Sequence, residues 1–247
     1  MNMKNCRNLL LAAAVLAAAS SCSDKVQVKG TLAGAPDTQV VVKQLSGSTL
    51  VTLDTLKTDA SGAYSCKIDV LKGQPQFVYL FKGDTKIASL LLQKGDKVKV
   101  ASDTLGKYSV EGSEESEKLR QVEEDFAAFM DKFSADAAAG DNAAASKDYI
   151  EYYRGCVKYI MTNSKSLTSI PVLYQKVNES FPIFSQATDA ILFQNVHDSL
   201  MTVYPESKYL EALKKEAEKR FNIFNLSQRV QNARESSYKF IDRKSVV

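Results

Sequence analysis

Between Lys25 and Val110 the chain alternates apolar and polar residues over short stretches, the period-two pattern of half-buried β-strands. Turn signals such as G-A-P-D (34–37) and two K-G-D triplets (82–84 and 94–96) separate the stretches. Short strands at this spacing favour an antiparallel β-sandwich or open barrel. The predicted strands cover residues 26–32, 39–45, 50–58, 63–70, 76–81, 87–92 and 97–102.

From Ser113 onward the apolar residues recur at intervals of three and four, which is typical of amphipathic helices. The predicted helical stripes run from Leu119 to Phe133, from Tyr149 to Ile160, from Pro171 to Val177, from Leu192 to Val203 and from Leu210 to Phe224. The fold class predicted from both halves is α+β, with an N-terminal antiparallel β-sandwich or open barrel followed by an all-α helical region.

The change of period places a domain boundary near Gly112, where a glycine turn precedes a capping serine, Ser113. This divides the chain into an all-β domain (22–112), a helical domain (113–235) and an unstructured tail (236–247) without periodicity. Residues 135–146 form an alanine-rich linker that Gly140 interrupts. We expect residues 24–112 to fold without the helical half, and the helical half alone to be less stable.

The first 21 residues read as a signal peptide, with Lys4 and Arg7 before an apolar run. That run, about eleven residues, spans about 16 Å as a helix, roughly half of a membrane core. Small residues then precede Cys22, and the stretch resembles a bacterial lipoprotein signal, although Ala19 stands where leucine is usual. The resemblance implies cleavage before Cys22 and lipidation of its thiol. The alternative is an ordinary signal peptide with an incidental cysteine.

Charge and hydropathy limit the classes of partner that we expect for the chain. The formal net charge is +3, with basic and acidic residues interspersed and no basic block, so nucleic acid is not an expected partner. After the signal, no apolar run approaches a membrane-spanning length. We expect the mature chain to be soluble apart from its anchor.

Two cysteines remain beyond Cys22. The absence of a C-x-x-C motif excludes the usual dithiol redox site and a four-cysteine zinc site. Cys66 shares an alternating apolar face with Tyr64 and Ile68, and Cys156 lies on an apolar helical stripe. Both are predicted to be buried free thiols.

Residues that resemble catalytic groups have simpler interpretations. His197 is the only histidine and has no nucleophile linked to it by a motif, so a boundary or core position is favoured. The tyrosines are spread over different elements and are predicted to be core or boundary residues rather than a sugar-stacking patch. An acidic group at the first helix is favoured by the helix dipole and is expected to face water; it comprises Glu114, Glu115, Glu123, Glu124 and Asp125.

Three short triplets, D-T-L twice and D-S-L once, resemble the Asp-Ser/Thr-aliphatic sites that some anaerobic Gram-negative bacteria O-glycosylate in the periplasm. The candidate acceptors are Thr55, Thr104 and Ser199. An acceptor hydroxyl must be exposed, and Thr104, beside a loop-like L-G-K, is expected to meet this condition best.

An ordered series of segments resembles the uncharacterised all-β domain at the N-terminus of many exported lipoproteins of anaerobic Gram-negative bacteria. The segments are V-K-G-T-L, L-D-T-L-K-T-D-A-S-G-A-Y-S-C, L-L-L-Q-K-G-D-K-V-K-V and Y-S-V-E-G-S-E-E-S-E-K-L, followed by helical counterparts N-S-K-S-L-T-S and Y-P-E-S-K-Y-L-E-A-L. The resemblance covers roughly residues 25–235.

In that family the helical region usually leads into a thioredoxin-like domain of the alkyl hydroperoxide reductase and thiol-specific antioxidant type, with a W-C-x-x-C active site. The sequence has no tryptophan, and it ends at Val247, where such a domain would begin. The family's catalytic residues therefore match no position. A naturally short relative and an interrupted gene both remain open.

These observations predict a lipid-anchored protein of the Gram-negative cell envelope, facing the periplasm, that acts as a non-catalytic binding or scaffolding module. Its expected partners are the membrane, through the N-terminal lipid, and an envelope protein; we expect no catalytic residue, metal or cofactor. The alternative is a thiol-disulfide oxidoreductase or peroxiredoxin-like accessory enzyme using Cys66 or Cys156. A reactive thiol needs basic, partly exposed surroundings, and alternation points Lys67 away from Cys66.

Overall fold

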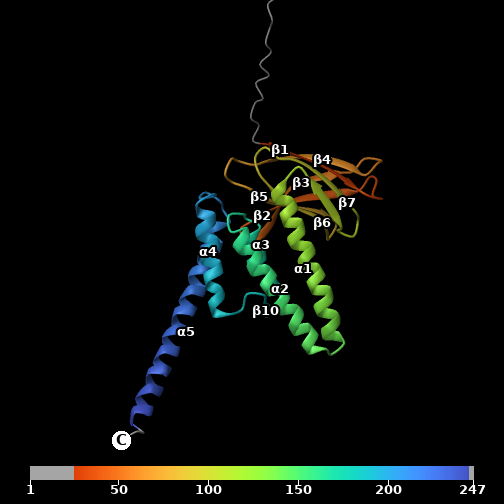
Figure 1. Ribbon diagram of the computed structural model, residues 1–247. Coiled ribbons are helices and arrows are strands. Elements are labelled where there is room, and N and C mark those ends of the chain that lie inside the picture. Colours follow the sequence, from red (N-terminus) through yellow and green to blue (C-terminus); the bar gives the residue numbers. More distant parts are fainter. Residues whose placement is uncertain (1–24, 245–247) are drawn as a thin grey trace, which may run out of the picture.

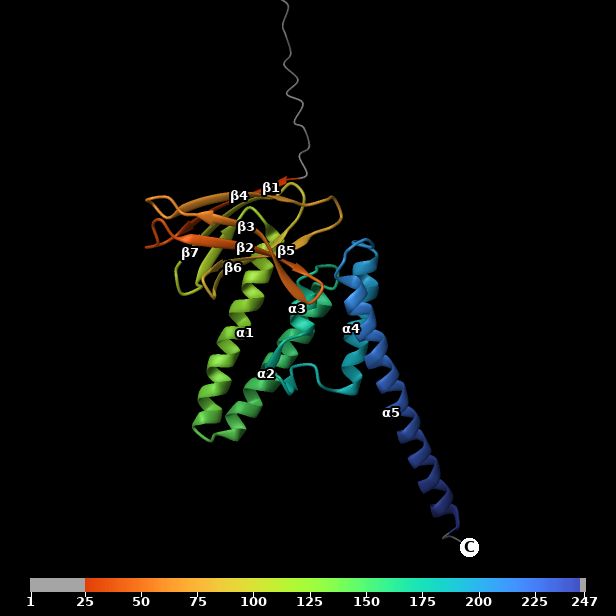
Figure 2. The same ribbon diagram turned by 180° about the vertical axis from the view of Figure 1, so that it is seen from behind.

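The computed structural model describes the backbone of residues 25–244 and the side chains of residues 25–234. The predicted Cys22 and signal peptide lie outside these residues. Figure 1 shows a β-sandwich with the helices gathered on one side of it, and Figure 2 shows the same arrangement from behind. The α+β class predicted from the sequence is confirmed.

Eight strands form the sandwich. They are β1 (Lys25–Leu32), β2 (Gln39–Ser46), β3 (Thr49–Lys57), β4 (Ala63–Asp69), β5 (Gln76–Lys82), β6 (Thr85–Leu92), β7 (Lys97–Ser102) and β8 (Tyr108–Glu111). One sheet has the order β4-β1-β7-β8 and the other β3-β2-β5-β6. All seven predicted strands are present. The strand β8 was not among them, because four residues are too few to show alternation.

The sequence predicts antiparallel sheets, but one of the two sheets is mixed. Strand β1 pairs antiparallel with β4 but parallel with β7, in register from Gln27 opposite Lys97 to Leu32 opposite Ser102. Alternation reveals which face a residue occupies but not the direction of its neighbouring strand, so the pattern could not predict this pairing.

The helical region contains α1 (Glu114–Ala138), α2 (Asn142–Thr162), α3 (Ser169–Leu173), α4 (Ala190–Met201) and α5 (Leu210–Lys244). A small hairpin, β9 (Lys176–Asn178) and β10 (Phe181–Pro182), and a 3-10 turn, η1 (Ala187–Asp189), connect α3 to α4. The region is therefore not purely helical, and Val177, predicted to lie in a helix, lies in β9.

The start of α1 follows the prediction. The Ser113 side chain accepts a hydrogen bond from the Ser116 backbone N–H and caps the helix. Gly112 has a φ of +81°, and a Cβ there would lie 2.0 Å from the Lys97 carbonyl oxygen, so only glycine fits.

Two other predictions about the helices were wrong. The alanines of the supposed 135–146 linker belong mostly to α1 and α2, and only residues 139–141 separate the helices. Residues 236–244, predicted to be an unstructured tail, continue α5. No glycine or proline interrupts residues 210–244, and extending an existing helix costs far less than starting one.

The apolar interior consists of two clusters. One fills the space between the two sheets and includes Val28, Cys66 and Leu80. The other joins the helices to the outer face of the second sheet, through Phe77 on β5 and Leu91 on β6. Strand β6 is therefore buried on both faces along Ile87–Leu92, and the helices supply the cover for one of them.

Candidate functional site

A cavity of about 360 Å³ lies where the second sheet meets the helices. We call it the seam cavity. Its walls come from the β2–β3 hairpin, β5, α3 and the start of α5, and its lining residues are Leu45, Gly47, Ser48, Phe77, Tyr79, Ile170, Pro171, Tyr174, Lys208, Tyr209, Ala212 and Leu213. The lining is mostly apolar and aromatic, which is typical of sites that enclose an apolar group.

Tyr209 and Phe77 form the inner wall of the seam cavity. The Tyr209 hydroxyl accepts a hydrogen bond from the Phe77 backbone N–H (2.9 Å) and donates one to the Leu45 carbonyl (3.4 Å). The two rings meet edge to face, with centroids 4.9 Å apart. Burial raises the pKa of Tyr209 to about 12, so its hydroxyl stays protonated at neutral pH. The wall is therefore rigid and uncharged.

The mouth of the cavity carries one charge. Among the described lining residues, Lys208 is the sole charged side chain; its ammonium lies 5.3 Å from the centre of the Tyr209 ring. Burial lowers the pKa of Lys208, because desolvation disfavours the charged amine. Tyr174, another lining residue, is 44% exposed. The arrangement suits an apolar or aromatic group with a hydrogen-bond acceptor at its outer end.

A second hollow, about 420 Å³, lies between α1 and α2; we call it the α1–α2 groove. Val122, Tyr152, Cys156 and Val172 line it, and charged residues such as Asp125 lie around them. The Tyr152 ring stacks on Phe129, with centroids 4.2 Å apart. Its hydroxyl donates to the Gln175 side chain (2.8 Å), so the face and the polar end of Tyr152 are already used within the protein.

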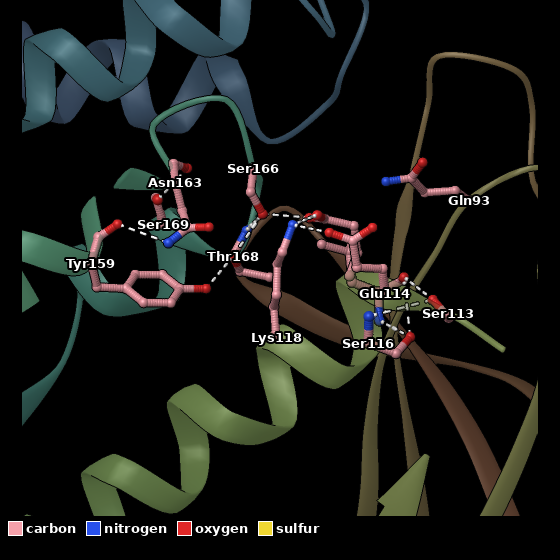
Figure 3. Close-up of polar contacts among 12 residues, drawn as sticks. Gln93, Ser113, Glu114, Ser116, Lys118, Tyr159, Asn163, Ser166, Thr168 and Ser169 are labelled. Atoms are coloured by element: carbon pink, nitrogen blue, oxygen red, sulfur yellow. Dashed lines mark hydrogen bonds and ion pairs between the residues drawn. The ribbon is translucent and has the colours of Figure 1, made fainter. Parts of the chain in front are cut away.

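The sheet end of α1 and the α2–α3 loop are joined by a polar network (Figure 3). The Lys118 ammonium lies 2.8 Å from carboxylate oxygens of both Glu114 and Glu115. Glu115 in turn accepts a hydrogen bond from the Ser166 hydroxyl. Ser166 and Tyr159 both hydrogen-bond Thr168, at 2.6 and 2.7 Å between oxygens. These bonds satisfy groups that the junction buries, so we interpret the network as structural.

The same junction contains a hydrogen bond between helix and strand. The Ser116 hydroxyl accepts from the Leu91 backbone N–H (3.0 Å), and the Ser113 hydroxyl donates to Asp96 (2.7 Å). Both serines are buried. The first turn of α1 is therefore attached to the end of β6 and to the turn after it.

The prediction that the acidic group at α1 faces water is wrong for two members. Glu115 is half-buried in the network just described. Glu123 is also half-buried and accepts from the Lys86 ammonium (2.6 Å), the Ser89 hydroxyl (2.7 Å) and the Tyr108 hydroxyl (3.1 Å). Helical periodicity alone could not reveal that this face of α1 lies against β6.

The two thiols are free and buried, as predicted. Cys66 belongs to the sandwich cluster and Cys156 to the helical cluster. Burial raises the pKa of each thiol to about 11, and neither pKa is lowered by a cationic neighbour. The Cys156 thiol donates a long hydrogen bond to Gln175 (3.6 Å). A thiol in such surroundings is a poor nucleophile at neutral pH.

The other candidate residues lie apart from the seam cavity. His197 is half-buried on α4, and its Nδ1 lies 2.9 Å from an Asp198 oxygen. Thr55 is exposed on β3, whereas Thr104, in a turn, and Ser199, on α4, are half-buried. The expectation that Thr104 is the most exposed acceptor is therefore wrong, because β3 is an edge strand with exposed side chains. Cys22 lies outside the described residues.

Among residues 25–234, no His, Cys, Asp and Glu side chains gather in groups of three or more that could hold a metal ion. Within that part of the chain, every helix is too short or too polar to cross a membrane.

Comparison with known proteins gives one family match. Residues 26–119 match a family described as a domain of unknown function (DUF4369). No curated protein is detectably similar to the chain. The matched stretch contains the sandwich except for its first residue, Lys25, and ends within α1, at a buried leucine, Leu119.

Sequence reasoning missed the seam cavity. Its residues come from four separate segments, and none forms a motif. The one local signal was Y-P-E-S-K-Y-L (204–210), in which Tyr209 directly precedes a helix. Only the contact of Tyr209 with Phe77 on β5 reveals what that tyrosine does.

Proposed function

We propose that the protein is a lipid-anchored component of the Gram-negative cell envelope that acts as a non-catalytic binding or scaffolding module. The seam cavity is its binding site, for an apolar or aromatic group with an acceptor near Lys208. The single observation that carries this proposal is an aromatic, almost uncharged concavity between the sandwich and the helices.

The surroundings of the thiols support a non-catalytic role over thiol redox. A working thiol needs a lowered pKa and access to its substrate. The two thiols have little access to a substrate, since Cys66 is 8% exposed and Cys156 is 5% exposed. Burial raises the pKa of each thiol instead of lowering it. Reductase turnover of insulin disulfides that is lost in Cys66→Ser or Cys156→Ser would instead favour the redox alternative.

The cavity is tested by filling it. Ala212 on α5 lines the cavity, and Ala212→Phe places a ring in the space. We expect the wild-type chain to bind the fluorescent apolar probe N-phenyl-1-naphthylamine, and Ala212→Phe to bind it at least about tenfold more weakly. Ala128→Phe, at an exposed position on α1, is the matched control. Equal probe binding by all three chains would refute a site in the cavity.

The anchor is tested separately. Cys22→Ala removes the predicted lipid acceptor, so cells fed a labelled fatty acid should incorporate label into the wild-type chain and not into the variant. Equal label in both chains would contradict lipidation at Cys22. The result does not depend on the cavity experiment.

A further inference from the structure

Helix α5 extends beyond the helices on which it packs (Figures 1 and 2). Near its start Leu210, Leu213 and Ala217 are buried in the helical cluster. Arg220 ends this contact by donating a hydrogen bond to the Phe184 carbonyl (2.9 Å) and lying over the Phe193 ring. From Phe221 to Arg234 every side chain is exposed except Phe224, which is half-buried.

The exposed part of α5 carries an apolar stripe. Ile223, Leu226 and Val230 are 54%, 63% and 45% exposed and follow each other at intervals of three and four. This is the a and d spacing of a heptad, with Ile223 and Val230 at a and Leu226 at d. At 100° per residue, the stripe lies on the side of the helix away from Leu213 and Ala217. The stripe is a second apolar face of α5, and its spacing allows another helix to pack on it.

The charges beside this stripe are all of one sign. In the same heptad frame Arg229 occupies a g position and Arg234 an e position, the two positions that flank a helix–helix seam. Residues 219–234 contain Lys219, Arg220, Arg229 and Arg234 and no acidic residue. A partner helix with flanking acidic residues therefore complements this face.

A second copy of the chain does not complement it. In a parallel pair, the g residue of one helix meets the e residue of the next heptad on the other, which places Arg229 against Arg234 twice. In an antiparallel pair, e meets e and g meets g, which again opposes arginines. Like charges at these positions disfavour self-pairing and set partner choice.

We propose that the outer face of α5, formed by Ile223, Leu226 and Val230 with Arg229 and Arg234, docks an amphipathic helix of another protein whose apolar seam is flanked by Asp or Glu. This inference rests on the proposed scaffolding function and specifies the chemistry of the partner. It does not use the seam cavity, so either site can fail without the other.

Two synthetic amphipathic peptides test the proposal. Both carry Ile and Leu at a and d; one has Glu at every e and g position and the other has Lys. Fluorescence anisotropy with the full chain in mild detergent measures their binding. We expect the Glu peptide to bind at least about tenfold more tightly than the Lys peptide, with an affinity that falls as salt rises.

Variants of α5 test the contributions of its arginines and of its apolar stripe separately. Arg229→Glu with Arg234→Glu should reverse the preference toward the Lys peptide, and Leu226→Asn should abolish binding of either. The matched control is Lys72→Glu with Lys165→Glu, which makes the same change of net charge in two exposed turns and should leave the Glu-peptide preference unchanged. Unchanged thermal melts confirm that the variants remain folded.

Three results would overturn the proposal. One is equal affinity for the two peptides, or none for either. Another is a dimer in sedimentation equilibrium that Leu226→Asn dissociates, which would make a second copy the occupant. The third is binding of the Cys22→Ala chain to phosphatidylglycerol vesicles that requires Leu226, without peptide binding, which would make a lipid surface the occupant.

Discussion

The hydroxyl of Tyr209 accepts a hydrogen bond from the backbone N–H of Phe77, 2.9 Å away, near the start of β5 in the second sheet. The residue just before α5 thus satisfies a buried donor on β5, although 132 positions separate the two in the sequence. The sandwich and the last helix are joined by a specific polar contact as well as by apolar packing.

Tyr209→Phe should destabilise the protein by about 1–3 kcal/mol, because it leaves the buried Phe77 N–H without its acceptor. Urea unfolding followed by circular dichroism measures the change. Tyr174→Phe is the control, because Tyr174 is 44% exposed and its substitution should change the free energy of unfolding by less than about 0.5 kcal/mol. Equal effects of the two substitutions would mean that the Tyr209 hydrogen bond contributes nothing specific.

Glu123→Ala should also cost about 1–3 kcal/mol, because the Ser89 and Tyr108 hydroxyls lose the carboxylate that accepts from both. The same urea titration applies. Asp131→Ala removes an exposed carboxylate from α1 and should be nearly neutral. A neutral Glu123→Ala would show that water replaces the carboxylate at no cost.

Alkylation of the thiols should depend on pH in a defined direction. Burial raises the pKa of Cys66 and Cys156 to about 11, so thiolate is scarce below that pH. Relative to the ordinary cysteine pKa of 9.0, this rise makes the thiolate fraction at neutral pH roughly 100-fold smaller. Iodoacetamide labelling, read by peptide mass spectrometry, should therefore be slow at neutral pH and faster as the pH approaches 11.

An introduced, exposed thiol provides the reference rate for the alkylation experiment. Ser65 is exposed on β4 beside Cys66, so Ser65→Cys introduces a thiol on the opposite face of the same strand. The introduced thiol should react at the rate of a solvated cysteine while Cys66 does not. Native Cys66 or Cys156 reacting as fast as the introduced thiol at neutral pH would contradict the raised pKa and favour a redox role.

The fragment 24–112 should melt at a lower temperature than the fragment 24–138. Removing the helices exposes Phe77 and Leu91, which are almost fully buried in the intact chain. Covering them again with α1 recovers part of that apolar burial, at roughly 25 cal/mol per Å². Thermal melts by circular dichroism compare the fragments. Equal melting temperatures would support the expectation from the sequence that residues 24–112 fold without the helical half.

Local patterns predicted the local structure well. Alternation located seven strands, and Ser113 identified the start of α1, because both signals lie within a few consecutive residues. Two of the failures depended on distant partners, because the parallel β1–β7 pairing and the burial of Glu123 against β6 leave no short-range signature. The helical continuation past residue 235 has a local signal, the lack of glycine and proline in residues 210–244.

The candidate site was less predictable than the fold. Tyr209, Phe77 and Lys208 were not singled out, because aromatic residues in a strand and at a helix entry look like ordinary core residues. Their convergence follows from the packing of α5 on the sheet. By contrast, the burial of Cys66 and Cys156 was predictable, since each sits on the apolar face of its own element.

The position of β1 has a mechanical consequence. Lys25 begins a strand that lies inside its sheet, hydrogen-bonded to β4 on one edge and to β7 on the other. With a tether at Cys22, tension would enter the fold through this interior strand. A pull along β1 strains both ladders at once, whereas an edge strand has only one ladder to hold it. A lipid at Cys22, as proposed, would therefore pull on a strand that is held along both of its edges.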